Sequence, residues 1–172
     1  ADRRGVRSFG SSCKVHGNYA EILYERNALD DLEELLSAYV DGGADWILPS
    51  DIIAVLSPAV KARIARSRLG EAEELLGRAE ALRRSHRIFP RLLAVLRDLH
   101  IRFAAAAGTA DRFVPPPPPA ATSASIAQAT AASDLRLALA RGEYRTVEEG
   151  ARRLAAAALA ADSIALFIEA KA

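Results

Sequence analysis

The chain has 172 residues, a formal net charge of +1, one cysteine and no methionine. This length allows one domain, or two small ones, with a buried core. One cysteine excludes a disulfide framework, and no uninterrupted apolar run reaches the ~20 residues that a membrane-spanning helix needs. Alanine supplies 37 residues and aromatic residues only 6% of the chain, which favours closely packed helices over a sheet.

Residues 1–17 are basic and rich in serine and glycine, with no helical spacing of apolar residues. We expect a flexible tail that is disordered or lies along a partner. The Arg-rich, Ser-rich and acid-poor composition also resembles the end of a mitochondrial transit peptide, and Arg7–Ser11 resembles a site cut by the matrix processing peptidase. This resemblance implies a mitochondrial location, and an ordinary basic tail implies a cytoplasmic one.

Residues 18–108 carry apolar residues at helical spacing and predict a helical domain. In the first helix, Asn18 to Arg26, we expect the apolar stripe to include Tyr19, Ile22 and Leu23. A new or sharply bent helix is expected at Ser57–Pro58, because serine at a cap followed by proline is a favoured helix start. The remaining helices are expected over 29–40, 51–56, 58–67, 69–84 and 90–108.

Residues 109–133 change character, with five consecutive prolines at 115–119 followed by alanine, threonine and serine. Consecutive prolines adopt an extended polyproline II rod, so we expect a linker. The alternative is that the rod is a ligand for an aromatic-lined groove. Residues 134–172 should then form a C-terminal helical hairpin, with helices over about 133–140 and 144–170.

Three segments share one pattern: an apolar residue, two spacers, an apolar residue, a pair of glutamates and further small or apolar residues. They begin at Leu29, Leu69 and Tyr144, and each follows a short break after an amphipathic helix. The second lies 40 positions after the first, and the third a further 75 positions on. Such a pattern suits the second helix of repeated hairpins, although ordinary antiparallel helices can also carry it.

Residues 137–147 place Gly142 and then Tyr144 before a helix of small residues, which resembles the tetratricopeptide turn. The span from Asn18 to Pro49 is similar to a pentatricopeptide unit. Together these resemblances imply an all-α protein of antiparallel helical hairpins stacked as a short α-solenoid, with a Pro-rich linker and a C-terminal helix pair. Proteins of this class bind partners through their helical surfaces.

Charge is distributed unevenly along the chain. Residues 18–51 carry a net charge of −8, whereas residues 61–102 carry +6. The two blocks either neutralise each other inside the fold or attract charged partners. Arginine makes bidentate contacts with phosphate and carboxylate groups, so RNA or an acidic protein face is a candidate partner. The candidate contact residues are Arg63, Arg66, Arg68, Arg83, Arg84, Arg87 and Arg91.

Residues suited to catalysis or metal binding are scattered. His16, His86 and His100 have no cysteine or carboxylate at ligand spacing, and Cys13 lies apart from them in the basic segment. We therefore expect no enzyme activity, no cofactor and no metal. The expected function is that of a structural or adaptor subunit, which binds other protein subunits of a larger assembly, such as a mitochondrial ribonucleoprotein. The alternative is a pentatricopeptide-like RNA-binding protein that uses the basic face of residues 61–102.

Overall fold

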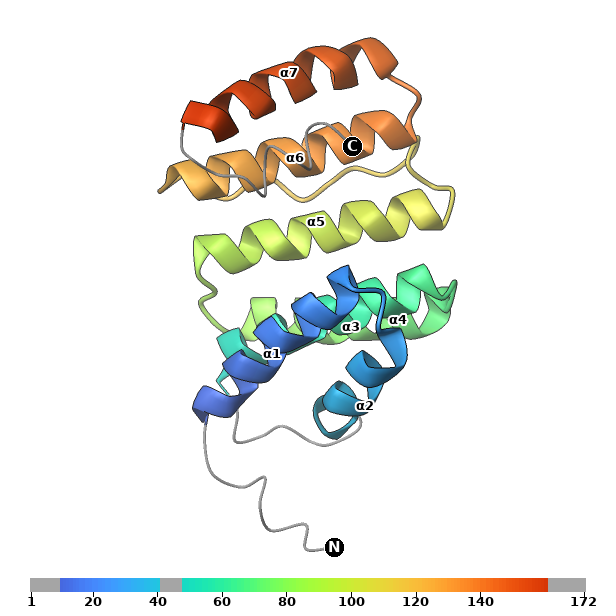
Figure 1. Ribbon diagram of the computed structural model, residues 1–172, viewed down its shortest axis with the longest axis vertical. Helices are drawn as coiled ribbons and strands as arrows, with labels where there is room; N and C mark the ends of the chain where they lie inside the picture. Colours follow the sequence, from blue (N-terminus) through green and yellow to red (C-terminus); the bar gives the residue numbers. More distant parts are fainter. Residues whose placement is uncertain (1–9, 41–47, 161–172) are drawn as a thin grey trace, which may run out of the picture. The chain divides into compact units, whose positions relative to one another are not determined.

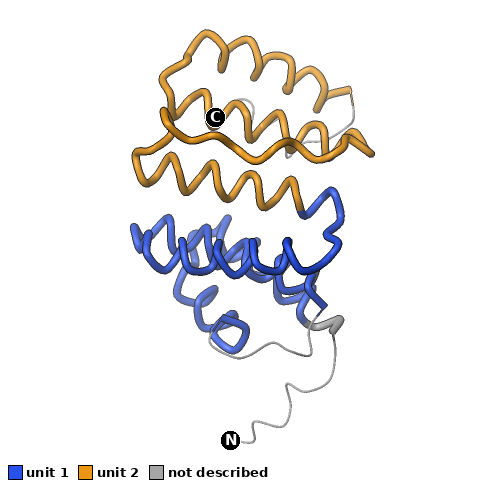
Figure 2. Tube along the Cα trace, turned by 180° about the vertical axis from the view of Figure 1, so that it is seen from behind, with its two compact units in different colours: residues 1–92 blue, residues 93–172 orange. Residues whose placement is uncertain are grey.

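The computed structural model describes residues 10–40 and 48–160. These residues form seven α-helices and no β-strand, which confirms the all-α prediction. The chain divides into two compact units, residues 1–92 and residues 93–172 (Figure 2). The division lies near the start of the fifth helix and not in the Pro-rich segment.

The first unit contains two antiparallel hairpins (Figure 1). One consists of α1 (Gly10–Glu25) and α2 (Leu29–Val40), and the other of α3 (Pro49–Ala65) and α4 (Leu69–Ser85). Helix α3 is central, because it packs against α1, α2 and α4. Its side chains accordingly supply much of the core, including Ile53, Val55, Leu56, Val60 and Ala62.

Helix α1 begins eight residues earlier than the predicted start at Asn18, so residues 10–17 are helical and not a flexible tail. Its buried stripe consists of Cys13, Gly17, Ala20 and Leu23, all small except the last. The stripe predicted from the larger residues was wrong, since only Leu23 of that set is buried. Small residues let two helix backbones approach closely, and this explains why α1 turns this face to the core.

Helix α3 is continuous through Pro58, so the new helix predicted to start at Ser57–Pro58 was wrong. Proline has no N–H, so the carbonyl of Ala54 lacks its usual helical donor. A Cβ added to Gly17 of α1 would lie 3.0 Å from the Ala54 oxygen, which means that a Gly17 Cα hydrogen points at this carbonyl. The glycine thus lets α1 cover the gap that the proline leaves in α3.

Three hairpin turns have the same backbone geometry. The residue in the left-handed conformation is Asn27 (φ 56°), Ser67 (φ 56°) or Gly142 (φ 73°). The N–H of the next residue then donates to the carbonyl five positions earlier, at 2.8–2.9 Å in each turn. The following helices begin at Leu29, Leu69 and Tyr144, as the shared sequence pattern predicted.

The second unit contains most of α5 (Pro90–Ala106), together with α6 (Ala124–Ala140) and α7 (Tyr144–Ala160). Helices α6 and α7 pack as an antiparallel hairpin (Figure 1). The predicted start of α6 near residue 133 was wrong, because Ser123 caps the helix by accepting a hydrogen bond from the Ile126 N–H at 3.4 Å. The expected linker therefore ends at residue 123. The expected end of the last helix, near 170, lies outside the described residues.

Candidate functional site: a charged cluster, a free basic segment and an apolar stripe

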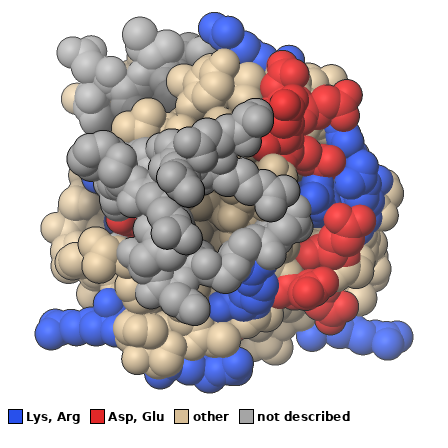
Figure 3. Space-filling model, turned by 90° about the horizontal axis from the view of Figure 1, so that it is seen from below, with Lys and Arg blue, Asp and Glu red and all other residues tan. Residues whose placement is uncertain are grey.

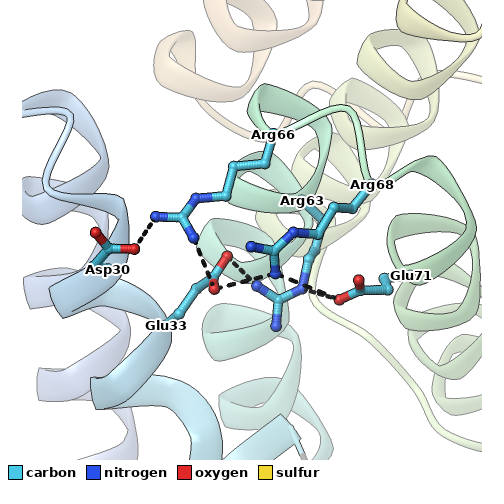
Figure 4. Close-up of polar contacts among 6 residues, drawn as sticks. All are labelled: Asp30, Glu33, Arg63, Arg66, Arg68 and Glu71. Carbon is cyan, nitrogen blue, oxygen red and sulfur yellow. Dashed lines mark hydrogen bonds and ion pairs between the residues drawn. The ribbon is translucent and has the colours of Figure 1, made fainter.

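The acidic start of α2 meets the turn between α3 and α4 (Figure 4). Six side chains form what we call the Glu33 cluster, with Glu33 of α2 at its centre. Acids come from α2 and α4, and bases from the end of α3 and the turn. The members are Asp30, Glu33, Arg63, Arg66, Arg68 and Glu71.

Glu33 pairs with three arginines. Its Oε2 accepts from Arg66 Nη1 at 3.2 Å and from Arg68 Nη1 at 3.3 Å, and its Oε1 pairs with Arg63. Arg63 Nε also lies 2.7 Å from Glu71 Oε2, which ties the end of α3 to the first turn of α4. The hydrogen bonds from Arg66 and Arg68 to Glu33 are between charged groups, and such bonds are about twice as strong as neutral ones.

The cluster becomes more exposed outward from Glu33. The side chain of Glu33 is 19% exposed and that of Arg63 only 15%, whereas Asp30 is 91% exposed. A hydrogen bond from Arg66 nevertheless holds the pKa of Asp30 below its usual value. Because its inner members are largely removed from water, we assign the cluster a structural role, which joins the first hairpin to the second.

The acidic and basic blocks of the sequence therefore neutralise each other in part. Three of the seven predicted partner contacts, Arg63, Arg66 and Arg68, already hold carboxylates of the chain itself. A fourth, Arg83, pairs with Glu80 of the same helix at 2.6 Å. Acidic and basic side chains also lie next to one another along one edge of the face drawn in Figure 3.

The other three predicted contacts are in a different environment. Arg84, Arg87 and Arg91 are exposed and have no ion pair among the described residues. They occur within eight residues, from the end of α4 to the start of α5, and we call residues 84–91 the basic segment. Phe89, in the same segment, is 68% exposed. Of the seven predicted contact arginines, these three are the ones that have no ion pair in the described part of the chain.

Helix α1 has an exposed apolar stripe that the sequence reasoning assigned to the core. Val15 is 62% exposed, Tyr19 49% and Ile22 48%. Their spacing of four and three residues places all three on one side of the helix. We call them the α1 stripe. The signal for this orientation was the second stripe of small residues, Cys13, Gly17 and Ala20, which occupies the buried side.

The single cysteine and the histidine nearest to it in sequence lie in the first unit. Cys13 is buried, its thiol donates to the Asp51 carbonyl at 3.4 Å, and burial raises its pKa to about 11. His16 Nδ1 lies 2.6 Å from the Tyr39 hydroxyl. Within 10–40 and 48–160 no group of three or more potential metal ligands comes together. No helix in these ranges has the length and apolar character to cross a membrane.

Comparisons with known proteins add no evidence on function. No family model matches the chain, and neither a curated protein nor a solved structure is found to be similar to it. The functional inference therefore rests on the basic segment, the α1 stripe and the chemistry of the residues around them.

Proposed function

We propose that the chain is a non-enzymatic adaptor built from tetratricopeptide-like or pentatricopeptide-like helical hairpins. It binds a protein partner within a larger assembly, such as a mitochondrial ribonucleoprotein. The mitochondrial part of this proposal is supported by the resemblance of residues 1–17 to the end of a transit peptide. The observation that carries the proposal is the α1 stripe. Large apolar side chains grouped on one face, with polar residues around them, are typical of protein interaction surfaces.

The position of the stripe supports a docking role. Helix α1 is fixed from behind by its small-residue face, where Gly17 approaches the Ala54 carbonyl, and by a Lys61–Glu21 ion pair of 2.8 Å. The stripe is therefore presented on a helix whose position is already set. A preorganised surface loses less conformational entropy when it binds than a flexible one does. A partner helix with complementary apolar residues would fit such a face.

The test compares two doubly substituted chains. Tyr19→Glu with Ile22→Glu places two charges in the stripe, while Leu139→Glu with Leu159→Glu places two charges at exposed apolar positions of the second unit. Both chains, expressed in the native cell with an affinity tag, are purified and their stoichiometric protein partners quantified by mass spectrometry. We expect the stripe variant to lose at least one partner that the control variant retains.

The adaptor proposal fails if the unmodified chain is recovered as a monomer without stoichiometric partners. The assignment to α1 fails if both variants retain the same partners in the same amounts. Circular dichroism and thermal unfolding of each purified variant show whether the fold is kept. Because all four positions are exposed, we expect small changes in stability, within about 0.5 kcal/mol for each substitution.

A second candidate function is RNA binding through the basic segment. The observation that favours it is the exposure of Arg84, Arg87 and Arg91 without ion-pair partners, next to the exposed ring of Phe89. Unpaired arginines attract phosphates, and an aromatic ring can stack on a base. The RNA interface would then be narrower than the whole 61–102 face. Arg63, Arg66 and Arg68 are engaged by the Glu33 cluster, and Arg83, Arg97 and Arg102 pair with other carboxylates of the chain.

Filter binding of a generic RNA at increasing salt tests this candidate. We expect affinity to fall steeply with salt and to be lost when Arg84, Arg87 and Arg91 are all replaced by glutamate. The control variant replaces three arginines of α7 by glutamate, namely Arg145, Arg152 and Arg153. Equal loss in both variants would indicate a nonspecific charge effect, and the absence of salt-sensitive binding would remove the candidate.

A further inference from the structure

The Pro-rich segment of the second unit is held against the helices on either side of it in sequence. Arg97 of α5 is 6% exposed, and its Nε donates to the Pro116 carbonyl at 3.0 Å. The same guanidinium pairs with Asp134 of α6 through Nη2 at 2.7 Å. This buried arginine thus joins the middle of the proline run to both α5 and α6.

The start of the segment is held in the same way. Arg141, at the end of α6, donates from Nε to the Ala110 carbonyl at 3.0 Å and from Nη2 to the Phe113 carbonyl at 2.7 Å. The Phe113 ring packs against a small core of Ile101, Ala110 and Leu137. The segment is therefore attached at two places and is not a free linker.

The exposure of residues 113–121 repeats every three positions, as expected for a polyproline II helix. One ridge is partly buried throughout and consists of Phe113, Pro116 and Pro119. A second ridge, formed by Val114, Pro117 and Ala120, is exposed throughout, with Val114 at 85%. The third ridge is Pro115, Pro118 and Ala121, of which only Pro115 is partly buried. One ridge faces the protein and two face outward.

Aromatic-lined grooves that bind polyproline II helices use two of the three ridges. Each half of such a groove takes a dipeptide with proline in its second position, and the two dipeptides are three residues apart. Val114–Pro115 and Pro117–Pro118 have this spacing, and both lie on the outward ridges. The remaining ridge, which such a groove leaves unused, is the one that this protein turns inward.

An arginine at one end of the proline run could set the direction in which the segment binds. Arg112 comes three residues before Pro115, is exposed and has no ion pair among the described residues. The sequence from Arg112 to Pro118 therefore reads Arg-x-x-Pro-x-x-Pro. A groove with carboxylates at one end would bind this arginine and fix the orientation of the chain.

We propose that residues 112–118 are a preformed docking epitope for a protein with an aromatic-lined, acid-flanked polyproline II groove. The proposal rests on the second unit and does not require that the α1 stripe bind anything. The chain presents residues 113–118 already extended and anchored, and only Arg112, which lies in the turn before the rod, has to be oriented on binding. A segment that is rigid before it binds loses less conformational entropy on binding, and proline-rich segments gain affinity in this way.

The test uses a purified SH3 domain that selects Arg-x-x-Pro-x-x-Pro ligands as the probe. Its affinity is measured by isothermal titration for the full chain and for a synthetic peptide of residues 110–122. We expect the chain to bind at least as tightly as the peptide. Binding at least about tenfold weaker by the chain than by the peptide would show that the fold covers the epitope and would overturn the proposal.

Substitutions on different ridges identify the surface that is used. Replacing Pro115 and Pro118 by alanine should weaken binding by about tenfold or more, whereas the same change at Pro116 and Pro119 should weaken it by less than about threefold. Arg112→Glu should weaken it by about tenfold, and the control Arg153→Glu should leave it unchanged. Equal effects of the two proline pairs, or no effect of Arg112→Glu, would contradict the proposal. Circular dichroism of each variant verifies the helical fold.

Discussion

The predicted contact arginines fall into two groups along residues 63–91, which we call the basic stretch, and the two groups have different environments. Residues 63–68 carry three arginines, and residues 84–91 carry three arginines and one histidine. In the first group the arginines meet Glu33 and its neighbours and are partly buried. In the second group Arg84, Arg87 and Arg91 have no acidic partner among the described residues. The comparison shows that charge density along a sequence does not reveal which charges remain available.

The difference arises from the position of each group relative to α2. The α3–α4 turn brings residues 63–68 beside the first turn of α2, where the acids Asp30 and Glu33 lie. The basic segment begins where α4 ends and continues through residues 86–89, which are not helical. Tertiary structure thus separates one basic block into a structural part and an exposed part.

Among single substitutions that test this separation, Glu33→Lys should have the largest effect. It would place a fourth positive charge among three partly buried arginines, so we expect the free energy of unfolding to fall by about 2–3 kcal/mol. Glu34→Lys is the matched control, since Glu34 is the adjacent acid and its side chain is exposed. Urea denaturation measures both. Similar losses in the two variants would mean that the Glu33 cluster contributes no more than general surface charge does.

A smaller effect is expected when one arginine of each group is neutralised. Arg66→Gln removes contacts to Asp30 and Glu33 and should lower the free energy of unfolding, though by less than Glu33→Lys does. Arg84→Gln removes no ion pair and should change it by less than about 0.5 kcal/mol. Thermal unfolding at low and high salt distinguishes them, because salt should reduce only the Arg66 effect. Salt-independent effects of equal size would contradict the comparison.

A smaller effect is expected from pH, which changes the ionisation of a largely buried carboxylate in the second unit, Asp98. Burial acts to raise the pKa of Asp98, but Arg102, Arg136 and the Ser133 hydroxyl outweigh it and hold the pKa below its usual value. Ionised Asp98 therefore stabilises the fold above pH ~4, and this contribution is lost as pH falls through the lowered pKa. Denaturation at pH 2 to 7 should show a loss at acid pH that is reduced in Asp98→Asn. If the stability of Asp98→Asn depends on pH as that of the unmodified chain does, the loss of stability at acid pH arises from other groups.

The sequence was informative where backbone geometry depends on local residues. The three helices that begin at Leu29, Leu69 and Tyr144 follow turns whose left-handed residue is Asn27, Ser67 or Gly142. Asparagine and glycine favour this conformation, and the apolar pattern after each turn marks the helix that follows. These features act over a few residues, so periodicity predicts them well.

The sequence was less informative where one helix compensates for another. Pro58 indicates a break when α3 is considered alone, and Gly17 indicates a poor helix former when α1 is considered alone. Packed together, the glycine lets α1 lie against the carbonyl that the proline leaves without a donor. The same packing turns Tyr19 and Ile22 outward, which is why the candidate docking surface was missed. Pairing between distant segments is not a local property of the sequence.

The central claim is that the arginines of residues 63–68 stabilise the fold, whereas those of residues 84–91 are exposed and do not. The most direct measurement compares two triple variants by urea denaturation, Arg63, Arg66 and Arg68 to glutamate against Arg84, Arg87 and Arg91 to glutamate. The account predicts that the first loses at least about 3 kcal/mol or fails to fold, while the second stays within about 1 kcal/mol of the unmodified chain. Equal losses, or a larger loss in the second variant, would contradict it.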